Sequence, residues 1–106
     1  MALDRYTAMA QSHLADTENA VDAMRATLAQ STGLQALRHL AHRVRGASLS
    51  LGLSALARSA SEIESGAAAQ RVAELEPLID ALAAGIGTTR RALAEFGAAA
   101  LQPERT

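Results

Sequence analysis

The residues best suited to chemistry lie in one stretch near the middle of the chain. Residues 38–52 contain two histidines and three arginines and no acidic residue. If this stretch and the residues from Leu34 onward form a helix, most of the apolar side chains fall within an arc of about 140° opposite His42, so the imidazole is expected to point into solvent. They are Leu34, Leu37, Leu40, Ala41, Val44, Ala47 and Leu51. A neutral imidazole is a nitrogen nucleophile near pH 7, and guanidinium groups bind phosphoryl oxygens. These residue types predict a histidine that accepts and donates a phosphoryl group.

A glycine lies beside this histidine on the same predicted face. Gly46 comes one turn after His42, where alanine would favour a helix by about 1 kcal/mol. A bare backbone next to an exposed imidazole allows close approach by a partner. His39 lies one turn before His42 and to the side, so it is expected to contact the partner at the rim of the site.

The stretch resembles a known motif. Ala41-His42-Arg43-Val44-Arg45-Gly46, followed by Gly52, is similar to the Ala-His-x-Leu-Lys-Gly...Gly motif of histidine-containing phosphotransfer (HPt) domains. Leu56 and Ile63-Glu64 resemble the downstream Leu and Leu-Glu of that family. The resemblance covers nearly the whole chain and implies a compact helical bundle that is phosphorylated on His42.

The resemblance also implies roles for two neighbours of His42. Arg45 replaces the usual lysine of the family and keeps its positive charge, so it is expected to stabilise the phosphoryl group. The phosphoacceptor domains of chemotaxis kinases have a glutamate at the offset of Glu64, which implies that Glu64 orients His42 by holding Nδ1–H and leaving Nε2 free. On its predicted helix Glu64 lies about 40 to 60° from the apolar centre and should be partly covered, whereas Glu62 points the opposite way.

By resemblance, the partners are response-regulator receiver domains and a hybrid histidine kinase. His42 would take a phosphoryl group from a receiver aspartyl phosphate and pass it to the aspartate of another receiver. Mg²⁺ would belong to the receiver, and no cofactor or metal is expected on this chain. The chain has no Gly-rich phosphate loop and no Walker-type lysine, so we expect a phosphotransfer protein without ATP binding or autokinase activity. The expected partner contacts are Arg38, His39, Arg43, Gly46 and Leu49.

Charge is distributed unevenly along the chain. Residues 23–61 contain five arginines and no acid, whereas the segments before and after them each sum to −3, giving the net charge of −1. A cationic middle segment attracts an acidic partner and raises encounter rates. Nucleic acid is disfavoured because there is no overall basic excess and the single Tyr and single Phe suit packing.

Other site chemistries fit less well. His39 and His42 could ligate a metal with Glu64, but a zinc site usually needs three or four ligands from converging elements. Ser48 and Ser50 have no elbow-like turn and no acid to orient a base, so a hydrolase triad is unsupported. The alternative from another class is a non-phosphorylated helical adaptor that binds an acidic protein through its basic face.

The length of 106 residues predicts one domain, residues 1–106. There is no cysteine, no apolar run of about 18 residues and no segment of signal-peptide type, so we expect a cytoplasmic protein without a membrane segment. The initiator Met favours a free-standing protein, expected to be a monomer.

The apolar spacing predicts only helices. The first region is helical to about residue 30; Asp16 or Thr17 could cap a second helix there, and the resemblance favours two helices over one. A turn at 31–33 precedes a helix over 34–49, which Gly52 ends, and a second helix follows over 53–65. Residues 66–69 are expected to form a loop or a loose helix end. The last helix covers 70–100, with Val72 and Phe96 among its inward residues, and a frayed tail follows at 102–106. The expected fold is all-α, an antiparallel four-helix bundle with a short additional N-terminal helix.

Overall fold

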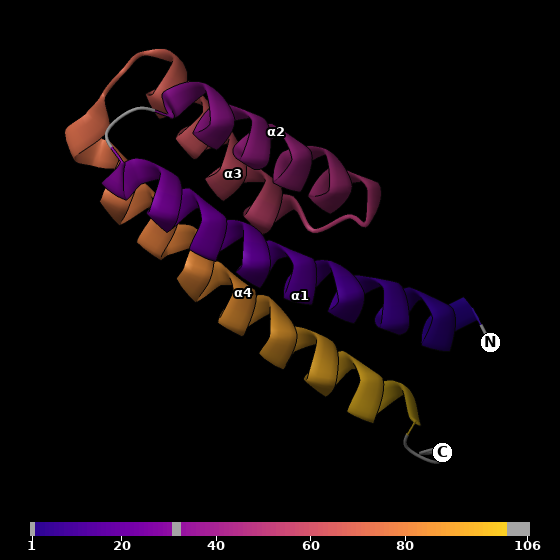
Figure 1. Ribbon diagram of the computed structural model, residues 1–106. Helices are drawn as coiled ribbons and strands as arrows, with labels where there is room; N and C mark the ends of the chain where they lie inside the picture. Colours follow the sequence, from indigo (N-terminus) through magenta and orange to yellow (C-terminus); the bar gives the residue numbers. More distant parts are fainter. Residues whose placement is uncertain (1, 31–32, 102–106) are drawn as a thin grey trace.

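The computed structural model describes residues 2–30 and 33–101, and within these ranges the chain forms four helices and no strand. They are α1 (Ala2–Ala29), α2 (Leu34–Ser50), α3 (Ser54–Ala68) and α4 (Val72–Leu101). Each helix runs antiparallel to the one before it, and each packs against two neighbours around one core (Figure 1). The predicted antiparallel four-helix bundle is confirmed. The predicted frayed tail and the first two residues of the turn at 31–33 lie outside the described residues.

The expected short extra helix at the N-terminus is wrong, because α1 is one continuous helix of 28 residues. Thr17 was a candidate cap for a second helix, but its hydroxyl instead donates to the carbonyl oxygen of His13, at 2.7 Å, within the same helix. A threonine that bonds to the carbonyl four residues earlier leaves the helix intact. No glycine or proline interrupts this segment.

The helices α2 and α3 are each followed by a residue with a left-handed backbone conformation. After α2, Gly52 has a φ of +74°, its N–H donates to Leu49 O at 3.1 Å, and Leu53 N–H donates to Ser48 O at 2.8 Å. This is a Schellman motif, in which a left-handed residue lets the last carbonyls find donors. Gly52 therefore ends the helix as predicted.

The end of α3 differs from the prediction. The helix continues through Ala68. The chain then turns at Gln70, which has a φ of +60° although it is not a glycine. Gly66 is buried inside α3, where an added Cβ would lie 3.1 Å from Leu75 Cδ2. Gly66 thus permits close packing of α3 on α4 and is not a stop signal.

The core consists of aliphatic side chains at three- and four-residue spacing on all four helices. Val72 and Phe96 were expected to face inward, but each is 53% exposed. Val72 begins α4, and Phe96 lies near the other end of α4, which extends past the α2–α3 hairpin (Figure 1). No helix in the described part of the chain is both long and apolar enough to cross a membrane. The largest fully buried apolar side chains are Leu14, Met24, Leu37, Leu56, Ile63, Leu75, Ile79 and Leu82.

Candidate functional site

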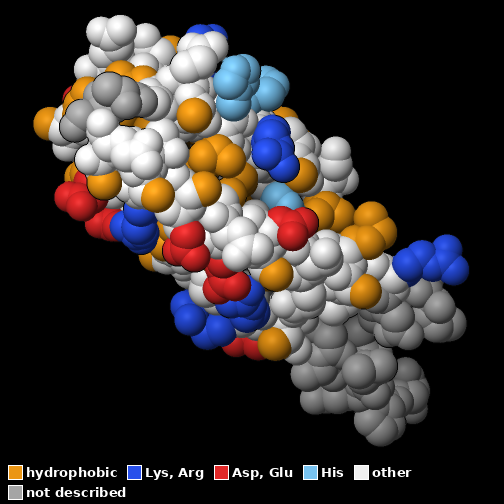
Figure 2. All heavy atoms as spheres, in the orientation of Figure 1, with side chains coloured by type: hydrophobic (Ala, Val, Ile, Leu, Met, Phe, Trp, Pro, Cys, Tyr) orange, Lys and Arg blue, Asp and Glu red, His pale blue; other side chains and the backbone are white. Residues whose placement is uncertain are grey.

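His42 stands on the outer face of α2. Its side chain is 58% exposed, whereas Ala41 and Val44 on the same helix are buried in the core. The helical spacing predicted this orientation, and the structure confirms it. Figure 2 shows histidine side chains standing out from the surface over α2.

A carboxylate from the neighbouring helix holds one nitrogen of this imidazole. Glu64, on α3, places Oε2 2.9 Å from His42 Nδ1. An ionised carboxylate can only accept, so this contact requires a hydrogen on Nδ1. A neutral ring then has its lone pair on Nε2, which has no hydrogen-bond partner among the described residues. The geometry thus makes Nε2 the nucleophilic nitrogen.

Arg45 completes a three-residue cluster. Its Nε donates to Glu64 Oε1 at 3.2 Å, and its Nη2 lies 3.2 Å from His42 Nδ1. Nδ1 cannot both donate to Glu64 and accept from Arg45, so with Glu64 ionised the hydrogens on Nη2 remain free for another acceptor. We call His42, Arg45 and Glu64 the His42 cluster.

The Glu64 carboxylate is 21% exposed, as its predicted partial cover requires. Burial acts to raise the pKa of this carboxyl, but the hydrogen bonds with His42 and Arg45 and their charges outweigh it and hold the pKa below the ordinary 4.5. Glu64 is therefore ionised at neutral pH. The matching glutamate Glu62 is exposed on α3 and has no contact with this cluster.

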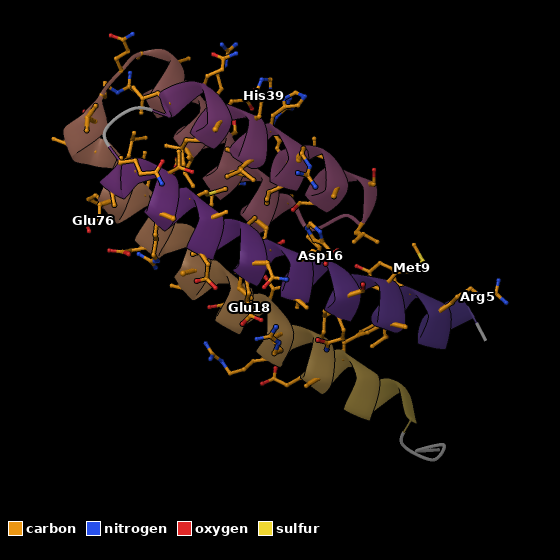
Figure 3. All side chains as sticks on the ribbon, in the orientation of Figure 1. Arg5, Met9, Asp16, Glu18, His39 and Glu76 are labelled. Atoms are coloured by element: carbon orange, nitrogen blue, oxygen red, sulfur yellow. The ribbon has the colours of Figure 1, made fainter. Side chains whose placement is uncertain are left out.

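The predicted partner contacts also lie on the surface of α2. Figure 3 shows His39 pointing outward from this helix. Arg38, Arg43 and Gly46 are exposed, and Leu49 is 54% exposed, unusually high for a leucine. A Cβ added at Gly46 would meet nothing within 4 Å, so packing within the bundle does not require this glycine.

Sequence reasoning missed a second polar cluster, between α1 and α2. The buried His13 places Nε2 2.8 Å from the hydroxyl of Ser48, which is fully buried. Thr17 lies at regular spacing with Ala10, Leu14 and Val21, so its burial could have been read from the apolar pattern. The pairing of His13 with Ser48 depends on how two helices meet, which helical spacing within either one does not give.

No three His, Cys, Asp or Glu side chains in residues 2–30 and 33–101 gather into a group that could hold a metal ion. His39 and His42 share α2, but the His39 ring pairs with Gln35, whose Nε2 lies 3.5 Å from His39 Nε2. Glu64 is committed to His42 and Arg45.

Comparison with known proteins agrees with the motif around His42. A family model described as the Hpt domain matches residues 2–95. The searches of curated proteins and of solved structures gave no match. The Hpt model matches most of the chain, and the four-helix bundle is the architecture of that family. The chain therefore belongs to the Hpt domain family, whose members are phosphotransfer modules of two-component signalling and interact with receiver domains and kinases.

Proposed function

We propose that this protein is a phosphorelay intermediate in which His42 Nε2 accepts a phosphoryl group from the aspartyl phosphate of a receiver domain and passes it to the aspartate of another receiver. The observation that supports this most strongly is the exposed imidazole with Nδ1 held by Glu64 and Nε2 unpartnered within the described chain. A hybrid histidine kinase would supply the first receiver.

The proposed transfer step needs only the groups that the His42 cluster provides. The Nε2 lone pair attacks phosphorus, the N–P bond forms, and the bond from phosphorus to the aspartyl oxygen breaks, so that its electron pair returns to the receiver carboxylate. The ring keeps its hydrogen on Nδ1 and becomes positively charged. Glu64, 2.9 Å from Nδ1, faces this new charge. Transfer in the opposite direction restores the neutral ring. Phosphoryl transfer of this kind depends mainly on positioning and charge neutralisation.

Arg45 has two functions in this proposal. Its Nε fixes Glu64, while the hydrogens on its terminal nitrogens bind the phosphoryl oxygens during transfer. Arg45→Lys would keep the positive charge but lose the forked guanidinium group that reaches both Glu64 and the phosphoryl oxygens. This variant should therefore retain part of the phosphotransfer activity, whereas Arg45→Gln should lose more.

The receiver would dock on the surface around His42. A receiver active site is a group of carboxylates around Mg²⁺, and Arg38 and Arg43 on α2 have no acidic partner among the described residues. The exposed Leu49 offers an apolar contact, and Gly46 leaves room for the loops of the receiver. The Mg²⁺ in this complex would be held by the receiver. The chain would act as a monomer in the cytoplasm, and it would neither bind ATP nor phosphorylate itself.

The experiment is transfer from a purified receiver charged with labelled acetyl phosphate. The chain should become labelled within the mixing time, and the label should be labile to acid and stable to base, as phosphohistidine is. His42→Gln should abolish labelling and keep the helical circular dichroism, because the side chain is exposed. His39→Gln is the matched control: it removes a partner contact but leaves the His42 imidazole, so this variant should still become labelled. Labelling from ATP alone would contradict the absence of autokinase activity.

The alternative is an adaptor that is never phosphorylated. If a receiver binds the chain, no label is transferred, and His42→Gln leaves binding unchanged, the basic face of α2 acts as an adaptor surface and the relay proposal is wrong.

A further inference from the structure

His13 is a buried titratable residue outside the His42 cluster. It projects from α1 toward α2, is 8% exposed, and places Nε2 2.8 Å from Ser48 Oγ. Thr17 Oγ1 lies 3.4 Å from the same nitrogen, but its hydroxyl hydrogen is committed to the carbonyl oxygen of His13. Ser48 is therefore the partner that joins this imidazole to the helix carrying His42.

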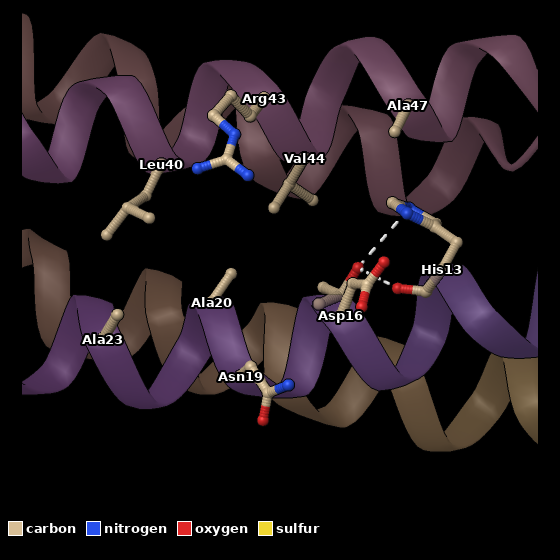
Figure 4. Close-up of a pocket in the computed structure, with 10 residues that line it drawn as sticks. His13, Asp16, Asn19, Ala20, Ala23, Leu40, Arg43, Val44 and Ala47 are labelled. Atoms are coloured by element: carbon tan, nitrogen blue, oxygen red, sulfur yellow. Dashed lines mark hydrogen bonds between the residues drawn. The ribbon is translucent and has the colours of Figure 1, made fainter.

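A groove of about 490 Å³ runs beside this contact between α1 and α2 (Figure 4). His13 lines it, together with one charged residue from each helix, Asp16 of α1 and Arg43 of α2. No side chain of α3 or α4 lines the groove. Asp16 would attract a positive charge on the imidazole, and Arg43 would repel it.

The hydrogen-bond inventory differs between the two protonation states of this ring. In the neutral ring Nε2 can carry the lone pair and accept from the Ser48 hydroxyl, which gives the hydrogen of this fully buried group a partner. In the cation Nε2 can only donate. Ser48 must then accept, and its hydroxyl hydrogen must turn away inside a buried site, while a positive charge is introduced between two packed helices.

We propose that His13 and Ser48 form a pH-sensitive clamp between α1 and α2, closed while the imidazole is neutral and weakened when the ring takes up a second proton. The groove beside the clamp gives the two helices room to separate locally without unpacking α3 from α4. Because the receiver would dock beside this interface, acid would slow phosphotransfer. That consequence rests on the proposed function, whereas the clamp does not.

The sign of the effect follows from the environment of the ring. Burial lowers the pKa of His13 below the ordinary 6.5, and the charge of Asp16 opposes this only in part. The folded chain thus binds fewer protons than the unfolded chain just below pH 6.5, so stability falls as the pH falls through that range. For one proton, the unfolding equilibrium constant rises by at most about tenfold per pH unit.

The test uses the unphosphorylated protein without a partner, so its outcome is independent of the relay. The imidazole C–H resonances and the methyl groups of Val44 and Ala20, which line the groove, are followed by NMR from pH 8 to pH 5. His13 should titrate below the ordinary imidazole pKa of 6.5, and the Val44 and Ala20 methyls should shift with the same midpoint as His13. The methyls of Ile63 and Ile79, in the α3–α4 part of the core, should not shift in this range.

A matched pair of variants separates the clamp from other titrating groups. His13→Gln keeps an amide that can bond to Ser48 and cannot titrate, so its urea-unfolding free energy should lose the fall between pH 7.5 and pH 5.5 that the native chain shows. His39→Gln, which removes an exposed imidazole, should keep that fall. If His13→Gln does not fold, the NMR titration of the native chain decides alone. The proposal is wrong if His13 titrates at or above the ordinary imidazole pKa of 6.5, or if the groove methyls do not follow its titration.

Discussion

Replacing Glu64 by alanine removes the carboxylate that fixes the hydrogen of His42 on Nδ1. In the native chain that carboxylate lies 2.9 Å from Nδ1 and is ionised at neutral pH. Without this carboxylate the neutral ring can also adopt the tautomer with its hydrogen on Nε2. In that tautomer Nε2 has no lone pair with which to attack phosphorus. The charged ring formed by phosphorylation also loses its counter-charge. We therefore expect the Glu64→Ala variant to accept phosphoryl groups more slowly while keeping its fold.

The magnitude follows from the exposure of the two partners. A net hydrogen bond to a charged group contributes about 1.5–3 kcal/mol when it is well protected from solvent. Here the His42 side chain is 58% exposed and that of Glu64 is 21% exposed, so screening reduces the value to about 1 kcal/mol. That energy corresponds to about a fivefold slower phosphoryl uptake. Stability should fall by about 1 kcal/mol or less, because the contacts of Glu64 with His42 and Arg45 are partly exposed to solvent.

Two measurements check this prediction. Rapid-quench transfer from one charged receiver gives the rate for the native chain, for Glu64→Ala and for the control Glu62→Ala, which removes the same charge from the exposed side of α3. Nitrogen-15 NMR of His42 gives the tautomer directly. An unchanged rate and tautomer in Glu64→Ala, or an equal loss of rate in Glu62→Ala, would refute the orienting role of Glu64.

Four further variants at three backbone positions are tested by urea unfolding, and one of them also by its phosphotransfer rate. Gly46→Ala should raise stability by up to about 1 kcal/mol, because an added Cβ meets nothing within 4 Å and alanine favours the helix. Gly46→Trp should slow phosphotransfer more than it lowers stability. A larger effect on stability than on the transfer rate would make Gly46 a packing residue. Gly52→Ala should lower stability by about 1–2 kcal/mol, because at a φ of +74° its Cβ is strained although no neighbour is near. Gln70→Gly should raise stability by about 1 kcal/mol, because it relieves the same strain at a φ of +60°, and a loss of stability would contradict this.

The site could be found from the sequence because it depends on short-range geometry. His42, Arg45 and Gly46 lie within two turns of one helix, so helical spacing alone determines which of them are exposed. Glu64 is on another helix, yet its offset from the apolar stripe of α3 predicted a partly covered carboxylate. The structure adds the 2.9 Å contact with Nδ1, which the periodicity could not give.

The misjudged elements share one physical cause, which is that a residue type has more than one use. Thr17 is a good cap, but in α1 its hydroxyl bonds back to His13 and the helix continues. Glycine often ends a helix, but Gly66 lies within α3, where its lack of a side chain leaves room for Leu75. The left-handed residue of the turn is Gln70 instead. Tertiary packing decides between such uses, and a single sequence does not contain the packing.

The most direct test of the relay account is to locate the phosphorus atom. The chain, labelled with nitrogen-15 in its histidines, is phosphorylated by a charged receiver and examined by phosphorus and nitrogen NMR under basic conditions. The account predicts a single phosphorus signal, coupled to Nε2 of His42 and not to Nδ1. A phosphorus signal coupled to Nδ1, or one that persists in His42→Gln, would contradict it.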